Sequence, residues 1–154
     1  MKYARTILVL LAVTLILLVM LQVSRRPSLE TETVKIGNTT VAVAVASTTA
    51  SREQGLSGSV SLPEGRGMLF VFPQDGTWGF WMKDMNFPID IIWIDAAGKV
   101  ITIAASLSPA TYPQVFYPAA PARYVLEVPA GFASRHGIDI GTAAIMPAGL
   151  SGTD

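Results

Sequence analysis

The sequence predicts a single mainly β domain of the α+β class, built on one compact antiparallel, partly closed sheet or barrel with about two short helices, after an N-terminal transmembrane helix. Three observations predict this class. About seven short β-prone runs are separated by turn signals. They lack the regular strand–helix alternation of a parallel α/β sheet. The length of 154 residues suits one compact domain once the N-terminal segment is set aside.

The N-terminal segment is predicted to be a membrane anchor. From Ile7 to Val23 nearly every residue is apolar, and a helix of that length almost crosses the ~30 Å hydrocarbon layer of a bilayer. Basic residues flank both ends, so the positive-inside rule does not decide the orientation. No run of small residues marks a cleavage site, which favours an uncleaved signal-anchor over a cleaved signal peptide. We expect a membrane-anchored domain on the extracytoplasmic side, or a secreted one if the segment is cleaved.

The chain therefore divides into four predicted parts. Residues 1–26 form the anchor or signal segment, 27–33 a linker, 34–147 the β-rich domain, and 148–154 a C-terminal tail. The chain contains no cysteine, which excludes a lipoprotein anchor, disulfides, thiol catalysis and cysteine metal sites. From Glu30 onward there are eleven acidic and seven basic side chains, so nucleic acid is not an expected partner.

The first elements of the domain are a hairpin and a short helix. "VKIGNTTVAVAVAS", residues 34–47, alternates apolar and small residues around a Gly37–Asn38 turn and predicts two paired strands. "STTASREQGL" follows, with Ser47 or Thr48 as an N-cap and Gly55 as a stop, and predicts a helix of about two turns.

Three β-prone runs come next. After the loop "SGSVSLPEGRG", the run "MLFVF" predicts a strand that Pro73 ends. "GTWGFWM", residues 76–82, and "IDIIWID", residues 89–95, are predicted to form a buried strand pair. In the second of these runs, alternate residues place mostly apolar side chains on both faces, so we expect this strand to be covered on both sides.

The remaining elements follow in the same way. "KVITIAASL" is expected to form a hairpin with "IIWI" across the turn Asp95–Gly98. The four prolines of "SPATYPQVFYPAAP", residues 108–121, predict an extended loop. "ARYVLEVP" is another strand, "AGFASRHG" a short helix that Gly137 ends, and "TAAIM" the closing strand.

Four separated blocks of the chain resemble a known family. They are, in order, "GLSGSVSLPEGRGMLFVF", "FWMKDMNFPIDIIWID", "GKVI" and "YPAAPARYVLEVPAGFASRHGIDIGT". Together they resemble the DUF192 family, also called UPF0127, over nearly all of residues 34–146. The resemblance implies one small β-rich domain, often behind a signal peptide or membrane segment, and it brings no biochemical activity with it.

The chain departs from the family pattern at two places. Members commonly have Asn-Thr where this chain has Asp84 and Met85, and many carry Met and Arg where it has Ser57, Gly58 and Ser59. Any activity that relatives owe to those positions does not carry over to this chain. Function must be argued from the site.

The candidate ligand-binding residues surround the loop "KDMNFP", residues 83–88. An exposed Met or aromatic residue beside charges is common at small-ligand contacts. Alternatively, the loop is a tight connection in which Phe87 plugs the end of the core. The candidate set is Trp81, Lys83, Asp84, Phe87, Asp90, Arg123 and Glu127.

The charged members of the set have structural alternatives. Asp84 and Asp90 could form a carboxyl pair for acid–base chemistry or a hard-metal site. Asp90, directly after Pro-Ile, could instead cap backbone amides, and the sequence favours this role because no third oxygen ligand is positioned by spacing. Arg123 could bind a substrate carboxylate or phosphate, or could form a structural ion pair with Asp84 or Asp90. His136, the only histidine, is expected to be a helix C-terminal cap.

Three functional hypotheses follow, none of them with a cofactor or a metal. The first is a domain that binds a small molecule or an envelope partner without catalysis. The second is an envelope hydrolase or lyase with Asp84, Asp90 or Glu127 as acid and base, and with Arg123 or Lys83 holding an anion. The third is an assembly module whose proline-rich loop, around Tyr112, Phe116 and Tyr117, meets another protein. No nucleophile elbow or Walker loop is present.

Overall fold

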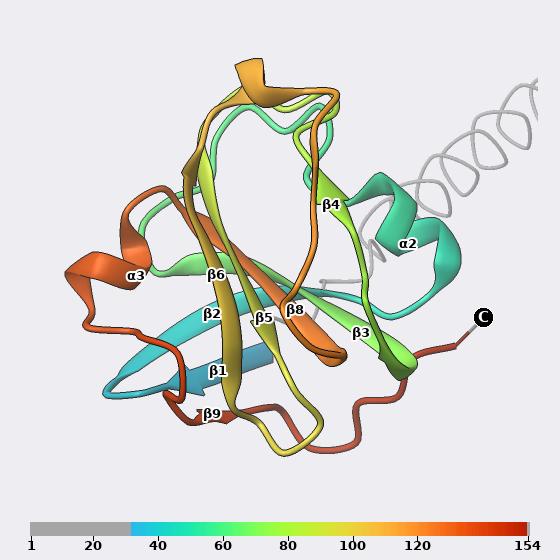
Figure 1. The fold of residues 1–154 in the computed structure, drawn as a ribbon, viewed down its shortest axis with the longest axis vertical. Helices are drawn as coiled ribbons and strands as arrows, with labels where there is room; N and C mark the ends of the chain where they lie inside the picture. Colours follow the sequence, from blue (N-terminus) through green and yellow to red (C-terminus); the bar gives the residue numbers. More distant parts are fainter. Residues whose placement is uncertain (1–31, 154) are drawn as a thin grey trace, which may run out of the picture. The chain divides into compact units, whose positions relative to one another are not determined.

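The computed structural model describes residues 32–153. The predicted membrane anchor lies outside these residues, and within them no helix is both long and apolar enough to span a bilayer. The described chain folds into a strongly curled sheet with a small two-stranded ribbon and two short helices beside it (Figure 1). The expectation of a mainly β, partly closed fold is therefore confirmed.

Two sheets and two α-helices make up the fold. The helices are α2 (Thr49–Gln54) and α3 (Phe132–Arg135), and a 3₁₀ turn spans Pro109–Thr111. The small sheet pairs β4 (Phe80–Trp81) with β7 (Val115–Phe116). The main sheet contains β1 (Glu32–Ile36), β2 (Thr39–Ala46), β3 (Arg66–Gly76), β5 (Ile89–Ile94), β6 (Val100–Leu107), β8 (Ala122–Pro129) and β9 (Ala144–Ile145).

The strands of the main sheet are interleaved rather than sequential. Their order is β6-β5-β8-β3-β2-β1-β9, and every neighbouring pair is antiparallel except β2 and β3, which are parallel. A parallel pair needs a crossover connection, and the crossover from β2 to β3 contains α2. Both predicted hairpins, β1–β2 and β5–β6, are confirmed.

The last strand bridges the two ends of the sheet. β9 pairs with β1, and the residues around it also bond to the start of β6. The Gly141 N–H donates to the Val100 carbonyl (2.8 Å), the Val100 N–H to the Thr142 carbonyl (3.0 Å), and the Ala144 N–H to the Gly98 carbonyl (2.6 Å). These bonds join the two edges of the curled sheet at one end, near β9 (labelled in Figure 1), and so close the sheet in part.

Each face of the sheet carries its own apolar cluster. The inner cluster lies inside the curl and includes Ile92, Leu126 and Phe132. The outer cluster lies under the β4–β7 ribbon and includes Phe70 and Trp93. Every residue of β5 is buried, and its alternate side chains divide between the two clusters. The prediction of a strand covered on both faces is confirmed.

Three sequence expectations are wrong. β3 does not end at Pro73 but continues to Gly76, because its register with β8 shifts between Val71 and Gly76 and the proline needs no ladder bond there. Segments 76–82 and 89–95 do not pair with each other. β4 pairs with β7 of the proline-rich segment, which also contains a 3₁₀ turn and is therefore not loop throughout. β5 pairs with β6 and β8.

Structured residues lie on both sides of the range 34–147 that the sequence predicts for the domain. β1 begins at Glu32, inside the predicted linker. At the other end, Leu150 packs against the inner cluster and the Thr153 N–H donates to the Ser47 carbonyl (2.8 Å). Two residues of the predicted tail, Leu150 and Thr153, thus contact the fold.

Candidate functional site

A cleft of about 940 Å³ lies between α2, the loop that follows it, and the aromatic residues of β3 and β4. In Figure 1, α2 and β4, which border the cleft, lie on the same side of the sheet, away from α3. Five aromatic side chains line it: Phe70, Phe72, Trp78, Phe80 and Trp81. A cleft of this size and composition is typical of small-molecule sites.

The aromatic wall is held in place by its own contacts. Phe70 and Phe72 lie on the same face of β3 because alternate residues of a strand point the same way. Phe72 stacks on Trp78 with ring centroids 4.2 Å apart, and Phe70 meets Phe80 edge to face at 4.8 Å. The Trp78 indole N–H donates to the Ala122 carbonyl (3.0 Å). These contacts fix the rings before any ligand arrives.

Glu127 brings a carboxyl group to this aromatic cleft. It lies on β8, with Met68 of β3 and Ile91 of β5 as its neighbours in register, and only 5% of its surface is exposed. Its Oε2 has no hydrogen-bond partner among the described residues. Burial raises the pKa of Glu127 to about 8. At neutral pH the group is therefore mostly protonated, and it can donate or accept a hydrogen bond.

Four charged residues also line the cleft. α2 contributes Arg52 and Glu53, and the loop between β4 and β5 contributes Lys83 and Asp84. Arg52 is already engaged: its Nη1 donates to the carbonyls of Ser47 (2.7 Å) and Val71 (3.0 Å). The cleft thus has an apolar wall and charges of both signs.

The two sides of the cleft are joined by hydrogen bonds. Asp84 has a left-handed backbone, with φ of 55°, which is uncommon for a residue other than glycine. In that conformation its carbonyl accepts a hydrogen bond from the Gly58 N–H (2.8 Å). The Ser57 hydroxyl donates to the Lys83 carbonyl (3.1 Å). These bonds link the loop after α2 to the loop after β4.

Four of the seven candidate residues lie on the cleft and three do not. Trp81, Lys83, Asp84 and Glu127 line it. Phe87 instead packs against the outer cluster, as in the alternative where it plugs the core. Among the assembly candidates, Tyr112 and Tyr117 are exposed and Phe116 packs against the same cluster.

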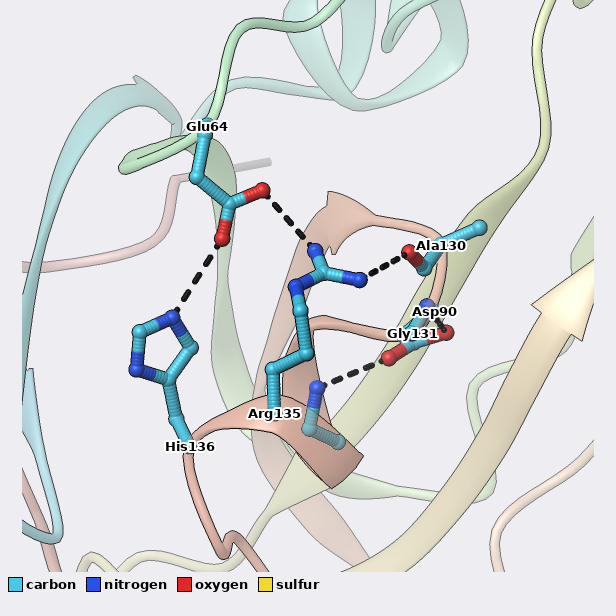
Figure 2. Close-up of polar contacts among 7 residues, drawn as sticks. Glu64, Asp90, Ala130, Gly131, Arg135 and His136 are labelled. Atoms are coloured by element: carbon cyan, nitrogen blue, oxygen red, sulfur yellow. Dashed lines mark hydrogen bonds and ion pairs between the residues drawn. The ribbon is translucent and has the colours of Figure 1, made fainter.

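Asp90 is fully buried and caps three backbone amides. Its Oδ1 accepts from the N–H groups of Ser106 (2.7 Å) and Gly131 (2.8 Å), and its Oδ2 accepts from that of Ala133 (2.9 Å). Figure 2 shows Asp90 beside Gly131, next to α3. The structure thus supports the capping interpretation, and it separates Asp90 from Asp84, which lies on the cleft.

Arg123 forms a structural ion pair, but with a partner other than those predicted. Its Nε donates to Oδ1 of Asp75 at 2.7 Å, and both side chains are partly exposed. The predicted partners, Asp84 and Asp90, are wrong. The correct one lies in the part of β3 beyond Pro73, which was not predicted to be strand.

A surface group of three polar residues lies beside α3. Glu64 accepts hydrogen bonds from Arg135 (2.8 Å) and pairs with the imidazole of His136 (3.3 Å), as Figure 2 shows. Desolvation opposes ionisation of Glu64, but the bonds and charges of His136 and Arg135 outweigh it and lower the pKa of this carboxyl. The backbone N–H of His136 donates to the Phe132 carbonyl (3.1 Å), which confirms its predicted C-cap position.

The match to a family model decides the relationship of this chain to known proteins. The model of DUF192, described as "Uncharacterized ACR", matches residues 32–145. The chain belongs to the DUF192 family. The resemblance seen in the four sequence blocks is confirmed. No curated protein matches this DUF192 chain.

Two solved structures are similar to this DUF192 domain. One, a protein of unknown function from Novosphingobium aromaticivorans DSM 12444, is 28% identical with a TM-score of 0.70, over 73% of this chain and 83% of that one. The other is described as a candidate transcription regulator from Sinorhizobium meliloti 1021. It is 31% identical with a TM-score of 0.68, over 77% of this chain and 95% of that one.

Sequence reasoning missed part of the cleft of this DUF192 domain. The sequence places Phe70, Phe72 and Trp78 in predicted strands but not in a predicted binding site. Phe70 and Phe72 alternate along one strand and so share a face, which could have indicated an aromatic wall. Arg52 was treated only as part of a helix. Within residues 32–153, no group of three or more His, Cys, Asp or Glu side chains is placed to hold a metal ion.

Proposed function

We propose that this DUF192 domain binds a small organic molecule in the cleft between α2 and the aromatic wall. One observation carries the proposal: a pre-formed aromatic cleft contains a buried carboxyl group, Glu127, with an oxygen that no described residue satisfies. A buried polar group without a partner costs roughly 1–3 kcal/mol. A ligand that supplies the missing hydrogen bond recovers that cost.

A fragment screen of the full-length protein tests the proposal. Amide resonances of the cleft glycines, Gly55, Gly58 and Gly79, should shift when a fragment binds. Trp81→Ala should weaken binding by about fivefold or more, since an aromatic contact contributes roughly 1 kcal/mol. The control is Tyr117→Ala, an exposed aromatic residue that does not line the cleft. A screen whose hits all shift residues elsewhere would refute the proposal.

We further propose that the domain is tethered to a membrane and faces the extracytoplasmic side. The support for the tether is the length and apolar character of the run 7–23. The support for the side is that the run is predicted to be an uncleaved signal-anchor. Fractionation of cells expressing the full-length chain should place it with membranes, and added protease should reach the domain once the outer barrier is opened. A chain protected from protease until the inner membrane is lysed would refute this placement.

A second candidate, catalysis, is favoured by the same carboxyl group. A group whose pKa lies near 8 can transfer a proton close to neutral pH. A hydrolase or lyase would use Glu127 as the acid or base, with Lys83 placed to hold an anion. Asp90 and Arg123 play no part in this version, since neither lines the cleft. Turnover of a bound fragment that Glu127→Gln abolishes would establish catalysis, and bound fragments recovered unchanged would leave binding alone.

A further inference from the structure

We infer that the ligand of the cleft is an organic base: a flat molecule whose protonated nitrogen forms an ion pair with Glu127 against the aromatic wall. This inference rests on the binding function proposed above and adds the chemical class of the ligand. It is carried by the position of Glu127, the balance of charge around the cleft, and the aromatic lining.

Glu127 lines the cleft and is a buried acid without a partner among the described residues. The side chain is 5% exposed and its Oε2 is unpartnered. None of the ion pairs within residues 32–153 includes it. Its register neighbours, Met68 and Ile91, are apolar. A carboxyl group in such surroundings is stabilised most by a partner that brings both an N–H donor and a positive charge.

The other charges of the cleft do not supply that partner. Arg52 is bonded to backbone carbonyls and lies over the Phe72 ring at 5.2 Å from its centroid. The Nζ of Lys83 lies 5.9 Å from the ring centroid of Trp81. Glu53 and Asp84 also line the cleft and offset these two cations. An approaching cation therefore meets no net positive charge.

The aromatic wall favours the same class of ligand. Ring faces attract cations, and the attraction grows when the cation is shielded from water. A flat aromatic body also packs well against less buried rings of the cleft, Phe80 and Trp81. An anionic group placed at Glu127 would face a carboxyl group instead of a donor that carries a positive charge.

Benzamidine and benzamide form a matched pair of probes. They have the same shape, but benzamidine is a cation and benzamide is neutral. Their binding to the full-length protein is measured by NMR titration. Benzamidine should bind about tenfold or more tightly than benzamide, because a hydrogen bond to a charged partner is much stronger than a neutral one. On binding, the proton of Glu127 is released to the solvent.

Two variants and a pH series isolate Glu127. In Glu127→Gln the preference for benzamidine should disappear, whereas Glu64→Gln, a matched change at a carboxyl group outside the cleft, should keep it. In the wild type, benzamidine affinity should rise with pH and level off above about 8, because Glu127 must be ionised to pair with it. This pH series does not depend on how well either variant folds.

The outcomes distinguish failure of the organic-base inference from failure of the binding function. If benzamide binds as tightly as benzamidine, or if Glu127→Gln keeps the preference, the inference of an organic base is overturned while the binding function stands. If other fragments bind the cleft but neither benzamidine nor benzamide does, the organic-base inference is also overturned and the binding function still stands. If no fragment of any class shifts the cleft resonances, the binding function itself fails.

Discussion

Two buried carboxyl groups on neighbouring strands have opposite surroundings, and this sets their roles. Asp90 of β5 accepts hydrogen bonds from three backbone N–H groups. Glu127 of β8 has an oxygen with no partner. The first is part of the framework, because it ties β6 and the start of α3 to β5. The second contributes nothing to the framework and is free to meet a ligand.

Replacing Asp90 by Asn should destabilise the protein although the side chain keeps its shape. The new NH₂ group would face the N–H of Ala133, or of Ser106 and Gly131, so at least one buried donor loses its acceptor. We expect a loss of about 2–3 kcal/mol in the free energy of unfolding, measured by urea denaturation. The matched control is Asp95→Asn, which keeps the oxygen that accepts from the Lys99 N–H. Equal stability of the two variants would contradict the capping role.

The stability of the wild type should fall as pH rises from about 5 to 8. Glu127 has an ordinary pKa of 4.5 when unfolded and about 8 when folded, so in this window the native state holds a proton that the unfolded state has lost. Stability is highest below the lower value and decreases toward the upper one. Urea denaturation should show a decrease of the order of a few kcal/mol. Glu127→Gln should lack this component, and an identical pH profile for the variant would contradict it.

Residue roles were only partly readable from sequence. The sequence favours a capping role for Asp90 over a carboxyl pair with Asp84, because an acid directly after Pro-Ile lies close to backbone amides. The burial of Glu127 was not predictable, since alternation along "ARYVLEVP" assigns it a face but does not show what covers that face. The cover comes from α2 and the residues around β4, which are distant in sequence.

At the scale of elements, α2 is a wall of the cleft that hydrogen bonds hold more than packing does. It has no buried residue, so packing alone holds it weakly. Arg52 compensates by joining it to Ser47, Val71 and Thr153 through hydrogen bonds from both terminal nitrogens. Its N-terminal box, in which Thr48 and Ser51 bond each other, fixes where it starts.

Arg52→Lys should loosen α2 without unfolding the sheet. A single ammonium cannot reach the same set of carbonyls as the guanidinium fork. We expect a loss of about 1–2 kcal/mol in stability and faster hydrogen exchange confined to α2 and the C-terminal residues. Arg66→Lys, an exposed arginine at the start of β3, is the control and should leave exchange unchanged. Exchange that accelerates evenly throughout the sheet would contradict this role of Arg52.

Elements and hairpins between neighbouring strands are predictable from the sequence, whereas pairings between strands distant in sequence are not. The two hairpins and the buried strand at 89–94 follow from tight turns and alternation, which depend on neighbouring residues alone. The predicted pairing of β4 with β5 is wrong because two aromatic runs that are adjacent in sequence need not be adjacent in space. Its true partner lies in the proline-rich loop, where the proline count hid a two-residue strand.

At the scale of the whole molecule, closure of the sheet depends on a glycine. Gly98 has φ of 78°, and a Cβ on it would collide with the carbonyl oxygen of Ala144. That carbonyl belongs to β9, the strand that bridges the two ends of the sheet. Any side chain at position 98 would therefore push the Ala144 carbonyl away and separate the joined edges of the sheet.

Gly98→Ala should open the closed end of the barrel. We expect a loss of about 2–4 kcal/mol, from backbone strain and the collision together, with faster hydrogen exchange at Lys99, Ala143 and Ala144. The control is Gly137→Ala. Gly137 also has a positive φ, of 62°, but nothing lies near its added Cβ. It should show only the strain, about 1 kcal/mol. Equal effects of the two variants would show that closure plays no part.

The place of β8 in the sheet determines the order in which the chain can assemble. Strands β1, β2 and β3 form one group and β5 and β6 another. β8 joins them by pairing with β3 and β5, and β9 with the residues before it joins β1 to the start of β6. Until residues 122–129 have been synthesised, both groups present unpaired edges. β9 follows later still. We therefore expect chains truncated before residue 122 to aggregate, and a full-length chain to reach its native sheet only near the end of its synthesis.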